Sequence, residues 1–368
     1  MEVTVHTTYP HYPDGRIKSP YRNRIRLVER DGPVKIIRSA VIPAPNRGRI
    51  RRLANHASFA ASALATSRAT GSADLVVAET PPLFLAAAAI PYARRAGAAL
   101  VLNLSDLWPD SAVDLGALRS RAAIGAARAL ERRCYRAATA IACPTEGIVE
   151  RLEAREESAR KVRRIAPAVD LAAFETTPAQ RTGAFRVLYA GTLGLAQGVE
   201  TLVEAAARID PGTVQVVIAG DGAEGDTLRR RAAALPNVRM LGTVAHAEVP
   251  GLLQAADAVA VTLRDRPVFA GALPTKMLEA MAAARPLVIS AVGEAARFVT
   301  DSGAGVAVPP EDPEALARAL RELAADTERA ASLGKAGRRW VEEGFGRDRF
   351  VAEWLDLISS LQRRDGRR

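Results

Sequence analysis

The chain has 368 residues, of which 48% are hydrophobic and 25% are charged. This length exceeds what one hydrophobic core usually serves, and the composition excludes a disordered or fibrous chain, so we expect two globular domains. The two cysteines, Cys134 and Cys143, are too few for a disulfide framework and have no companions for a zinc site. We therefore expect a reducing compartment and two buried thiols.

The net charge of +10 lies entirely in the first half of the chain. Residues 1–180 carry 27 Lys and Arg against 17 Asp and Glu, whereas residues 181–368 carry 24 of each. The excess is densest between Arg16 and Arg52, where the only acidic residues are Glu29 and Asp31. This pattern indicates either a solvated surface or one that binds anionic lipid headgroups. Nucleic acid is the weakest interpretation, because Tyr21 is the only aromatic residue of the stretch.

No signal peptide or membrane span is predicted. The most apolar run, residues 83–102, is interrupted by Pro91, Arg94 and Arg95, so it falls short of the roughly 20 apolar residues that a bilayer core requires. We expect a cytoplasmic protein that can lie peripherally on the inner face of the membrane.

The predicted elements alternate between strands and helices. The chain opens on a strand, residues 1–6, where a nucleotide-binding fold normally begins with another strand, a glycine-rich turn and a helix. This half therefore starts one βα unit late, or its start lies inside a longer protein. Further strands are predicted at 34–38, 75–78, 100–104, 139–143, 161–165, 186–190, 214–219, 238–241, 258–261 and 287–290, with helices such as 117–136, 197–208 and 225–234 between them.

This βαβ repetition predicts an α/β fold with two parallel, doubly wound sheets. We expect a first domain at 1–175, a polar linker at 175–183 and a second domain at 183–345. The final segment, 346–368, contains an amphipathic helix, 348–362. This helix either crosses back to the first domain or packs on the second.

Glycine turns follow two strands of the second half. Gly191 and Gly194 come after the strand at 186–190, just before a helix whose N-terminus favours phosphate. Asp221 and Gly222 come after the strand at 214–219, at the sheet edge where ligands bind in such folds. Asp221 fits a ligand contact and a helix cap equally well.

The segment 271–285 carries the strongest signal. A Pro-Thr break places Thr275 at the start of a short helix, and Lys276 and Glu279 then lie one turn apart on one face. An ordinary surface ion pair would have the same spacing. Beside the free amides of a helix start, however, this pair suits a nucleotide diphosphate and its ribose.

Five blocks of the second half resemble glycosyltransferase family four, the retaining enzymes with the GT-B fold. They are YAGTLGLAQG at 189–198, AGDG at 219–222, NVRMLG at 237–242, ADAV at 256–259 and PTKMLEAM at 274–281. In the first half, YPHYPDG at 9–15 and DLWPDS at 106–111 are similar to a bacterial subgroup that includes fucosamine and N-acetylhexosamine transferases of surface-polysaccharide assembly. The resemblance implies two Rossmann-like domains that face each other across a cleft, the first for acceptor and the second for a nucleotide sugar.

The chain also departs from this family pattern. The family commonly has two glutamates eight positions apart, and Glu279 matches the second, but Gly271 stands at the first. Thr192 and Gln197 occupy the places where many members have an Arg and a Lys for the diphosphate. Ser105 replaces a histidine that many members have beside the transferred sugar, so no catalytic histidine is expected.

The resemblance implies donor contacts from both glycine turns and from the helix at 275. The expected donor residues are Gly191, Thr192, Leu193, Gly194, Asp221, Gly222, Arg264, Thr275, Lys276 and Glu279. Lys276, Arg264 and the amides of 191–194 would stabilise the charge that grows on the leaving diphosphate, and Glu279 would accept hydrogen bonds from the ribose. No metal is required, and the departing phosphate can itself take the acceptor proton.

The acceptor side is expected in the first domain. Asp106 follows the strand at 100–104 and is the candidate catalytic residue there, with Ser105 and Trp108 as acceptor contacts. The other interpretations are a turn cap for Asp106 and a core position for Trp108. The four histidines have no ligand spacing, although His246 lies in a loop that can approach the base.

We therefore expect a retaining glycosyltransferase without a metal cofactor. It would move a hexose or N-acetylhexosamine from a nucleotide diphosphate, with UDP favoured, to a lipid-linked or small-molecule acceptor. A nucleotide-sugar epimerase of the same fold and a non-catalytic nucleotide-sugar-binding subunit remain as alternatives.

Overall fold

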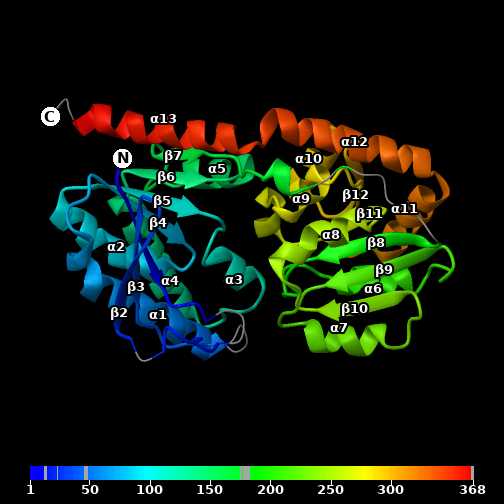
Figure 1. The fold of residues 1–368 in the computed structure, drawn as a ribbon, viewed down its shortest axis with the longest axis horizontal. Coiled ribbons are helices and arrows are strands. Elements are labelled where there is room, and N and C mark those ends of the chain that lie inside the picture. Colours follow the sequence, from blue (N-terminus) through cyan, green and yellow to red (C-terminus); the bar gives the residue numbers. More distant parts are fainter. Residues whose placement is uncertain (12–14, 23, 45–48, 175, 177–182, 366–368) are drawn as a thin grey trace. The chain divides into compact units, whose positions relative to one another are not determined.

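The computed structural model describes residues 1–11, 15–22, 24–44, 49–174, 176 and 183–365. The chain divides into two compact units (Figure 1). Unit 1 comprises residues 1–143, 149–164 and 357–368, and unit 2 comprises residues 144–148 and 165–356. Residues 165–174, expected in the first domain, thus belong to unit 2, and most of the expected linker at 175–183 lies outside the described residues.

The described residues of unit 1 form two sheets. One has the strand order β1-β3-β2 and the other the order β4-β5-β6-β7. The strands are β1 (Val3–Thr8), β2 (Arg26–Asp31), β3 (Val34–Ser39), β4 (Leu75–Thr80), β5 (Ala99–Leu104), β6 (Ala140–Cys143) and β7 (Val162–Arg164). The helices are α1 (Arg49–Thr66), η1 (Ser67–Thr70), α2 (Leu83–Ala96), α3 (Asp110–Asp114) and α4 (Arg121–Ala137), and α5 (Glu146–Glu153) belongs to both units.

The smaller sheet differs from the predicted parallel sheet. β2 lies outside the strands predicted from the sequence; it pairs antiparallel with β3, while β1 pairs parallel with β3. Gly32 connects β2 to β3 at a φ of 54°, a conformation that glycine adopts without strain. Part of the basic stretch between Arg16 and Arg52 is therefore a β-hairpin, because a tight turn overrides the polar composition of β2.

Unit 2 is built on one six-stranded parallel sheet with the order β10-β9-β8-β11-β12-β13. Its strands are β8 (Phe185–Ala190), β9 (Val214–Ala219), β10 (Val238–Gly242), β11 (Ala258–Thr262), β12 (Leu287–Ser290) and β13 (Gly305–Val308). Its helices are η2 (Leu171–Ala173), α6 (Glu200–Ala206), α7 (Gly225–Ala232), η3 (His246–Glu248), α8 (Val249–Gln254), η4 (Pro267–Gly271), α9 (Lys276–Ala282), α10 (Glu294–Ser302), α11 (Pro313–Ala325) and α12 (Thr327–Gly344). The strand order reverses between β8 and β11, and ligands bind at such a reversal in doubly wound sheets.

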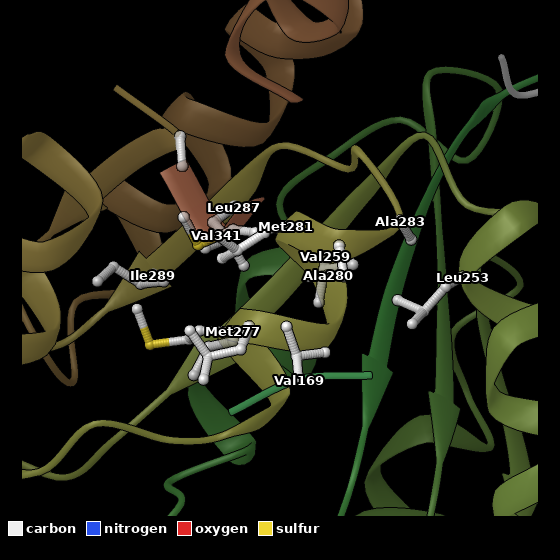
Figure 2. Packing of buried hydrophobic residues seen from close by; sticks show 14 of the residues in the cluster. Val169, Leu253, Val259, Met277, Ala280, Met281, Ala283, Leu287, Ile289 and Val341 are labelled. Atoms are coloured by element: carbon white, nitrogen blue, oxygen red, sulfur yellow. The ribbon is translucent and has the colours of Figure 1, made fainter. Parts of the chain in front are cut away.

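Alternate residues of these strands feed two hydrophobic clusters. Val259 of β11 lies in one cluster and Ala260 in the other, as expected for a strand that is buried on both faces. Figure 2 shows the first cluster, where Met277 and Met281 of α9 pack beside strands β11 and β12. Both methionines are fully buried, so α9 is held rigidly and its first residue, Lys276, has a fixed position at the sheet edge.

The last helix, α13 (Arg347–Asp365), contributes to both units. Its residues from Leu357 onward belong to unit 1, where Ile358 and Leu361 line a cavity together with Leu75 and Ala99. Cys134 and Cys143 are both buried and unbonded to each other. Within the described ranges, no helix is both long and apolar enough to span a membrane.

Candidate functional site

Two turns at the carboxyl ends of neighbouring strands lie back to back in unit 2. The turn 191–194 follows β8, and the turn 220–222 follows β9. The Leu193 N–H donates to the Asp221 carbonyl at 3.0 Å, and the Leu193 carbonyl accepts from the Glu224 N–H at 2.9 Å. A β-carbon at residue 220 would come within 1.8 Å of the Gly191 carbonyl oxygen. Glycine at 220 is therefore a steric requirement of this arrangement.

Most N–H groups of the first turn already have partners. The Gly191 N–H donates to the Ala219 carbonyl at 2.9 Å, and the Leu193 N–H is taken by Asp221. The Gly194 N–H donates to Oε1 of Gln197 at 3.1 Å. The amides of Gly191 and Leu193 are therefore taken by the neighbouring turn, and the Gly194 amide would become available to a diphosphate only if the Gln197 side chain moved.

The side chain of Lys276 lies directly against the first turn. A β-carbon at Gly191 would be 2.5 Å from Lys276 Nζ, so the ammonium group occupies the space that the glycine leaves open. The same Nζ lies 4.0 Å from the centre of the Tyr189 ring, and the Tyr189 hydroxyl donates to the Thr192 carbonyl at 2.9 Å. The structure therefore brings Lys276 together with Gly191, and Tyr189 connects this pair to Thr192. Sequence reasoning missed Tyr189, because a strand tyrosine before a turn looks like core.

Lys276 carries a charge with little compensation. Among the described residues, no carboxylate forms an ion pair with its Nζ within 4.0 Å. Burial lowers the pKa of Lys276 to about 8, and Glu279 opposes this shift only in part. A buried ammonium that keeps its proton at neutral pH without an ion-pair partner is well suited to receive an anion.

Glu279 lies on the same helix, one turn after Lys276. Burial raises the pKa of Glu279, and the nearby charges of His246 and Lys276 oppose the increase. His246 is exposed at the start of η3. His246, Glu279 and Lys276 therefore lie near one another at this edge of the sheet. Thr275, exposed at the helix start, makes no side-chain cap there.

Asp221 makes local contacts within its own turn. Its Oδ1 accepts from the Gly222 N–H at 2.8 Å and lies 3.5 Å from an Arg229 guanidinium nitrogen. The carboxylate thus lies beside the start of α7, where a β-carbon at Gly225 would be 2.2 Å from the same Oδ1. The N-cap residue of α7 is Glu224, which makes no side-chain cap, and both roles of Asp221 stay predictions.

Arg264 also has a different environment from the expected one. Its guanidinium group contacts three carboxylates, those of Glu200, Glu224 and Glu311. Its Nε donates to the Leu195 carbonyl at 2.8 Å. This placement leaves the guanidinium engaged with carboxylates within unit 2.

The missing first glutamate has a steric explanation. The segment 144–148 packs on η4 within unit 2, where a β-carbon at Gly147 would lie 2.6 Å from Gly271 Cα, and one at Gly271 would lie 2.9 Å from the Gly147 carbonyl carbon. The Thr145 hydroxyl donates to the Gly271 carbonyl at 2.7 Å, and Glu294 accepts from the N–H groups of Glu146 and Gly147 at 3.0 and 2.7 Å. A side chain at 271 has no room in this contact.

We therefore expect Gly271→Glu, which recreates the common family pattern, to damage the protein. The new side chain forces the 144–148 segment away and should lower the free energy of unfolding by about 1–3 kcal/mol. Denaturant unfolding measures this cost. Gly251→Glu is the matched control, since a β-carbon there meets nothing within 4 Å. Equal stability of the two variants would show that the Gly147–Gly271 contact is dispensable.

The candidate acceptor residues lie in unit 1, at the carboxyl end of β5. Ser105 is exposed, whereas Asp106 and Trp108 are partly buried. Burial raises the pKa of Asp106, while hydrogen bonds from the Ser111 side chain and the Leu107 backbone oppose the increase. Asp106 is thus hydrogen-bonded inside its own turn and still reaches the surface.

A charged network anchors the helix that follows Asp106. The Arg155 guanidinium contacts Asp110 of α3 and Glu131 of α4, each at 2.7 Å. Tyr135 donates to the same Glu131 at 3.0 Å. Sequence reasoning missed this network because its members are far apart along the chain. It gives the Asp106 turn a rigid support, which a functional site requires.

Known proteins agree with this architecture. One family model, described as glycosyl transferases group 1, matches residues 175–340, and another, a glycosyl transferase 4-like domain, matches residues 1–168. The chain belongs to glycosyltransferase family four. Both models describe glycosyltransferases, and this assignment favours neither the epimerase nor the non-catalytic subunit. The predicted α/β GT-B fold and the enzyme class are confirmed.

Individual relatives of this family-four glycosyltransferase differ in function. WcaI of Escherichia coli K12, a putative colanic acid biosynthesis glycosyl transferase, is 25% identical over 87% of this chain and 84% of its own length. Glycogen synthase of Mycobacterium tuberculosis is 33% identical, but the match spans only 45% of this chain and 40% of that protein. The solved structure of HepE from Anabaena, in complex with UDP and glucose, has a TM-score of 0.70 at 19% identity, covering 98% of this chain and 100% of HepE. The fucosamine-transferase subgroup stays a prediction.

Members of the family generally require no metal. In the part of the chain that the structure describes, no group of three His, Cys, Asp or Glu side chains is placed to hold a metal ion.

Proposed function

We propose that this family-four glycosyltransferase transfers a hexose or N-acetylhexosamine from UDP to a lipid-linked or small-molecule acceptor. One observation carries the donor part of the proposal: the Lys276 ammonium lies against Gly191, without an ion-pair partner among the described residues, at the edge of the sheet where the strand order reverses. The UDP in the HepE structure supports the choice of base.

In the proposed reaction, chain residues mainly stabilise the leaving group. Negative charge accumulates on the departing diphosphate, and the Lys276 ammonium stabilises it more strongly in a poorly hydrated site than it would in water. The Gly194 amide adds a hydrogen bond once Gln197 has moved. Glu279, ionised with two acceptor oxygens, binds the ribose hydroxyls. Asp106 orients the acceptor or sugar in unit 1.

A binding and turnover screen tests this function. The protein is titrated calorimetrically with UDP, GDP, UMP and uridine, and is then incubated with UDP- and GDP-sugars plus a lipid-phosphate-linked sugar, with products analysed by mass spectrometry. We expect UDP to bind at least tenfold more tightly than UMP, and a UDP-sugar to be consumed with retention at the anomeric carbon. Preference for GDP would overturn the choice of base, and donor isomerisation would indicate an epimerase. Donor binding without transfer or hydrolysis would indicate a binding subunit.

The pKa of Lys276 predicts how UDP binding depends on pH. Free Lys276 loses its proton near pH 8, and only the protonated form attracts the diphosphate, so binding is strongest below that pH. Above it, the dissociation constant should rise by up to about tenfold per pH unit, because a bound anion raises the pKa of the lysine and a proton must be taken up. Calorimetry from about pH 6.5 to 9.5 at constant ionic strength measures the profile. In Lys276→Met the profile should be flat, and a flat profile in the wild type would exclude this role of the lysine.

We also propose that unit 1 contacts anionic lipid headgroups, which places the enzyme near a lipid-linked acceptor. Ile25, Ile42 and Leu53 are 80%, 58% and 52% exposed. The Ala40 N–H donates to the Ile25 carbonyl, and the Ile42 backbone bonds to Ser58 and Asn55 of α1, so the segments that carry these side chains are neighbours. Exposed basic side chains accompany them, namely Arg22, Arg24, Arg26 and Arg51. Exposed apolar side chains flanked by basic ones are suited to the interface of an anionic bilayer.

Vesicle sedimentation tests this contact. We expect binding to vesicles that contain phosphatidylglycerol, weaker binding at high salt, and at least a fivefold loss in Ile25→Ser/Ile42→Ser. Val77→Ser, which changes another exposed apolar residue of unit 1, is the control and should bind like the wild type. Equal binding to neutral and anionic vesicles would contradict the electrostatic contribution, and equal binding of the double variant would contradict the surface itself.

A further inference from the structure

Arg264 connects four separate segments of unit 2. It follows β11, and its side chain is only 21% exposed. The Arg264 N–H donates to the Ala196 carbonyl at 3.0 Å, and its Nε donates to the Leu195 carbonyl at 2.8 Å. Its stem also lies against Gly198, where a β-carbon would come within 3.3 Å of Arg264 Cγ and where φ is 55°. Arg264 therefore fixes the far side of the loop 191–198, whose near side contacts Lys276.

Three carboxylates from three elements hold the guanidinium group. Glu200 is the first residue of α6, Glu224 immediately precedes α7, and Glu311 lies in the loop before α11. The Nη2 atom contacts Glu200 Oε1 and lies 3.1 Å from Glu224 Oε1, and Nη1 lies 3.1 Å from Glu311 Oε1. A planar guanidinium with five fixed donors can make all these contacts at once.

The charge around Arg264 is negative overall. Two guanidinium groups face three carboxylates, because Arg266 Nη1 also lies 3.7 Å from Glu311 Oε2. Oε2 of Glu200 and Oε2 of Glu224 are both buried without a hydrogen-bond partner. Burial and then the charge of Glu200 raise the pKa of Glu224, although the charges of Arg264 and Arg231 oppose the increase. A diphosphate brought onto this guanidinium would meet two uncompensated carboxylate oxygens, so Coulomb repulsion opposes direct binding there.

We propose that Arg264 is a positioning residue: it holds the loop 191–198 in the shape that places the Gly194 amide and Gly191 for a donor, and it does not itself contact the diphosphate. The loop is fixed twice. Gln197 holds the Gly194 N–H from within the loop, and Arg264 holds the carbonyls of residues 195 and 196 from outside. The consequence for the donor rests on the proposed function, whereas the effect on the loop does not.

The loop is tested first in the free protein. Amide hydrogen exchange over residues 194–198 is measured for the wild type, Arg264→Met and Arg264→Lys, with Arg239→Met as the control on β10. We expect exchange in this loop to become at least tenfold faster in both Arg264 variants, with the strands of unit 2 unchanged. Loop exchange within twofold of the wild type would overturn the proposal. Loss of protection throughout unit 2 would also overturn it, because it would make Arg264 a general stability residue.

The conservative variant Arg264→Lys distinguishes a positioning role from direct contact of the positive charge with the diphosphate. A lysine supplies the same charge to a phosphate, but a single ammonium cannot bridge three carboxylates and a carbonyl. We therefore expect Arg264→Lys to weaken UDP binding by at least fivefold, close to the effect of Arg264→Met. UDP affinity within twofold of the wild type in Arg264→Lys would overturn the proposal in favour of direct contact.

Removing a carboxylate distinguishes the two roles of Arg264 by whether UDP binding becomes tighter or weaker. If Arg264 contacted the diphosphate, Glu224→Ala would free its charge and tighten UDP binding. The positioning role predicts weaker binding in Glu224→Ala, and a double variant with Arg264→Met that is no weaker than Arg264→Met alone. Unchanged or tighter binding in Glu224→Ala overturns the proposal. If the wild type itself does not bind UDP, the proposed function fails, while the hydrogen-exchange result still decides whether Arg264 holds the loop.

Discussion

Replacing Lys276 with methionine is expected to lower glycosyl transfer about a hundred- to a thousand-fold and, at the same time, to stabilise the free protein. The loss of rate follows from removing a preorganised positive charge beside the leaving diphosphate, where a single group of this kind contributes about two to three powers of ten. Methionine matches the length of the aliphatic stem and removes only the ammonium with its contact to the Tyr189 ring, so the change is mainly electrostatic. Initial rates with a saturating UDP-sugar measure the effect.

The gain in stability follows from the pKa of the lysine. Burial holds the pKa at about 8 in the folded protein, below its ordinary value of 10.5, so at pH 7 the folded state carries an ammonium group that water would solvate better. This difference corresponds to about 3 kcal/mol against folding. Between the folded and unfolded pKa values the unfolded chain binds more protons, so wild-type stability should rise with pH there. The advantage of Lys276→Met should therefore be largest at neutral pH and should shrink above about pH 8.

Denaturant unfolding at pH 7 and at about pH 10 measures both the stability gain of Lys276→Met and its decrease at high pH. Lys335→Met changes an exposed lysine of α12 and should alter neither stability nor transfer. A Lys276→Met variant that is less stable than the wild type at pH 7 would contradict the buried charge. Full activity with higher stability would show that the charge is buried for a reason other than the donor.

Local sequence patterns predicted all but one strand of each unit. Strands β8 to β12 are short β-branched runs between clear turns, and their places were all predicted. In contrast, β2 contains Arg26, Glu29 and Arg30, and a strand with such a polar sequence shows no period-two apolar pattern. Its pairing with β3 depends on the turn at Gly32, and turn geometry is harder to read from sequence than hydrophobic spacing. The strand β13 was missed because Gly305 and two alanines surround its valines.

The candidate site was also predicted only in part. The Lys276–Gly191 contact joins residues 85 positions apart, and the sequence indicated both only because each follows a recognisable turn. The sequence does not show which charged residues contact Arg264 and Asp221. Arg264 meets three glutamates from distant elements, and Asp221 meets Arg229. A basic residue after a strand was therefore assigned to a phosphate, although the carboxylates around it make it a structural link. Sequence shows which charges exist, and tertiary packing decides which of them are already neutralised.

Gly220→Ala is expected to be the most destabilising single-methyl change in this part of the fold. Its β-carbon would lie 1.8 Å from the Gly191 carbonyl oxygen and 2.9 Å from the carbonyl carbon, and both atoms belong to backbone that β8 and β9 hold in register. The φ of 144° at residue 220 adds strain for any residue with a side chain. Because neither strand can move without breaking its ladder, we expect a loss of about 3–5 kcal/mol in the free energy of unfolding.

The same substitution should damage donor binding beyond its effect on stability. The only local relief is to push the 191–194 turn away, and that movement carries Gly191 off the Lys276 ammonium and Leu193 off its two hydrogen bonds. UDP affinity, measured at a temperature where the variant is still folded, should fall at least tenfold. Gly251→Ala, with open space around its β-carbon, should change neither quantity by more than about 0.5 kcal/mol. If Gly220→Ala lost stability but bound UDP normally, the two turns would be needed only for folding, and the donor would have to bind elsewhere on unit 2.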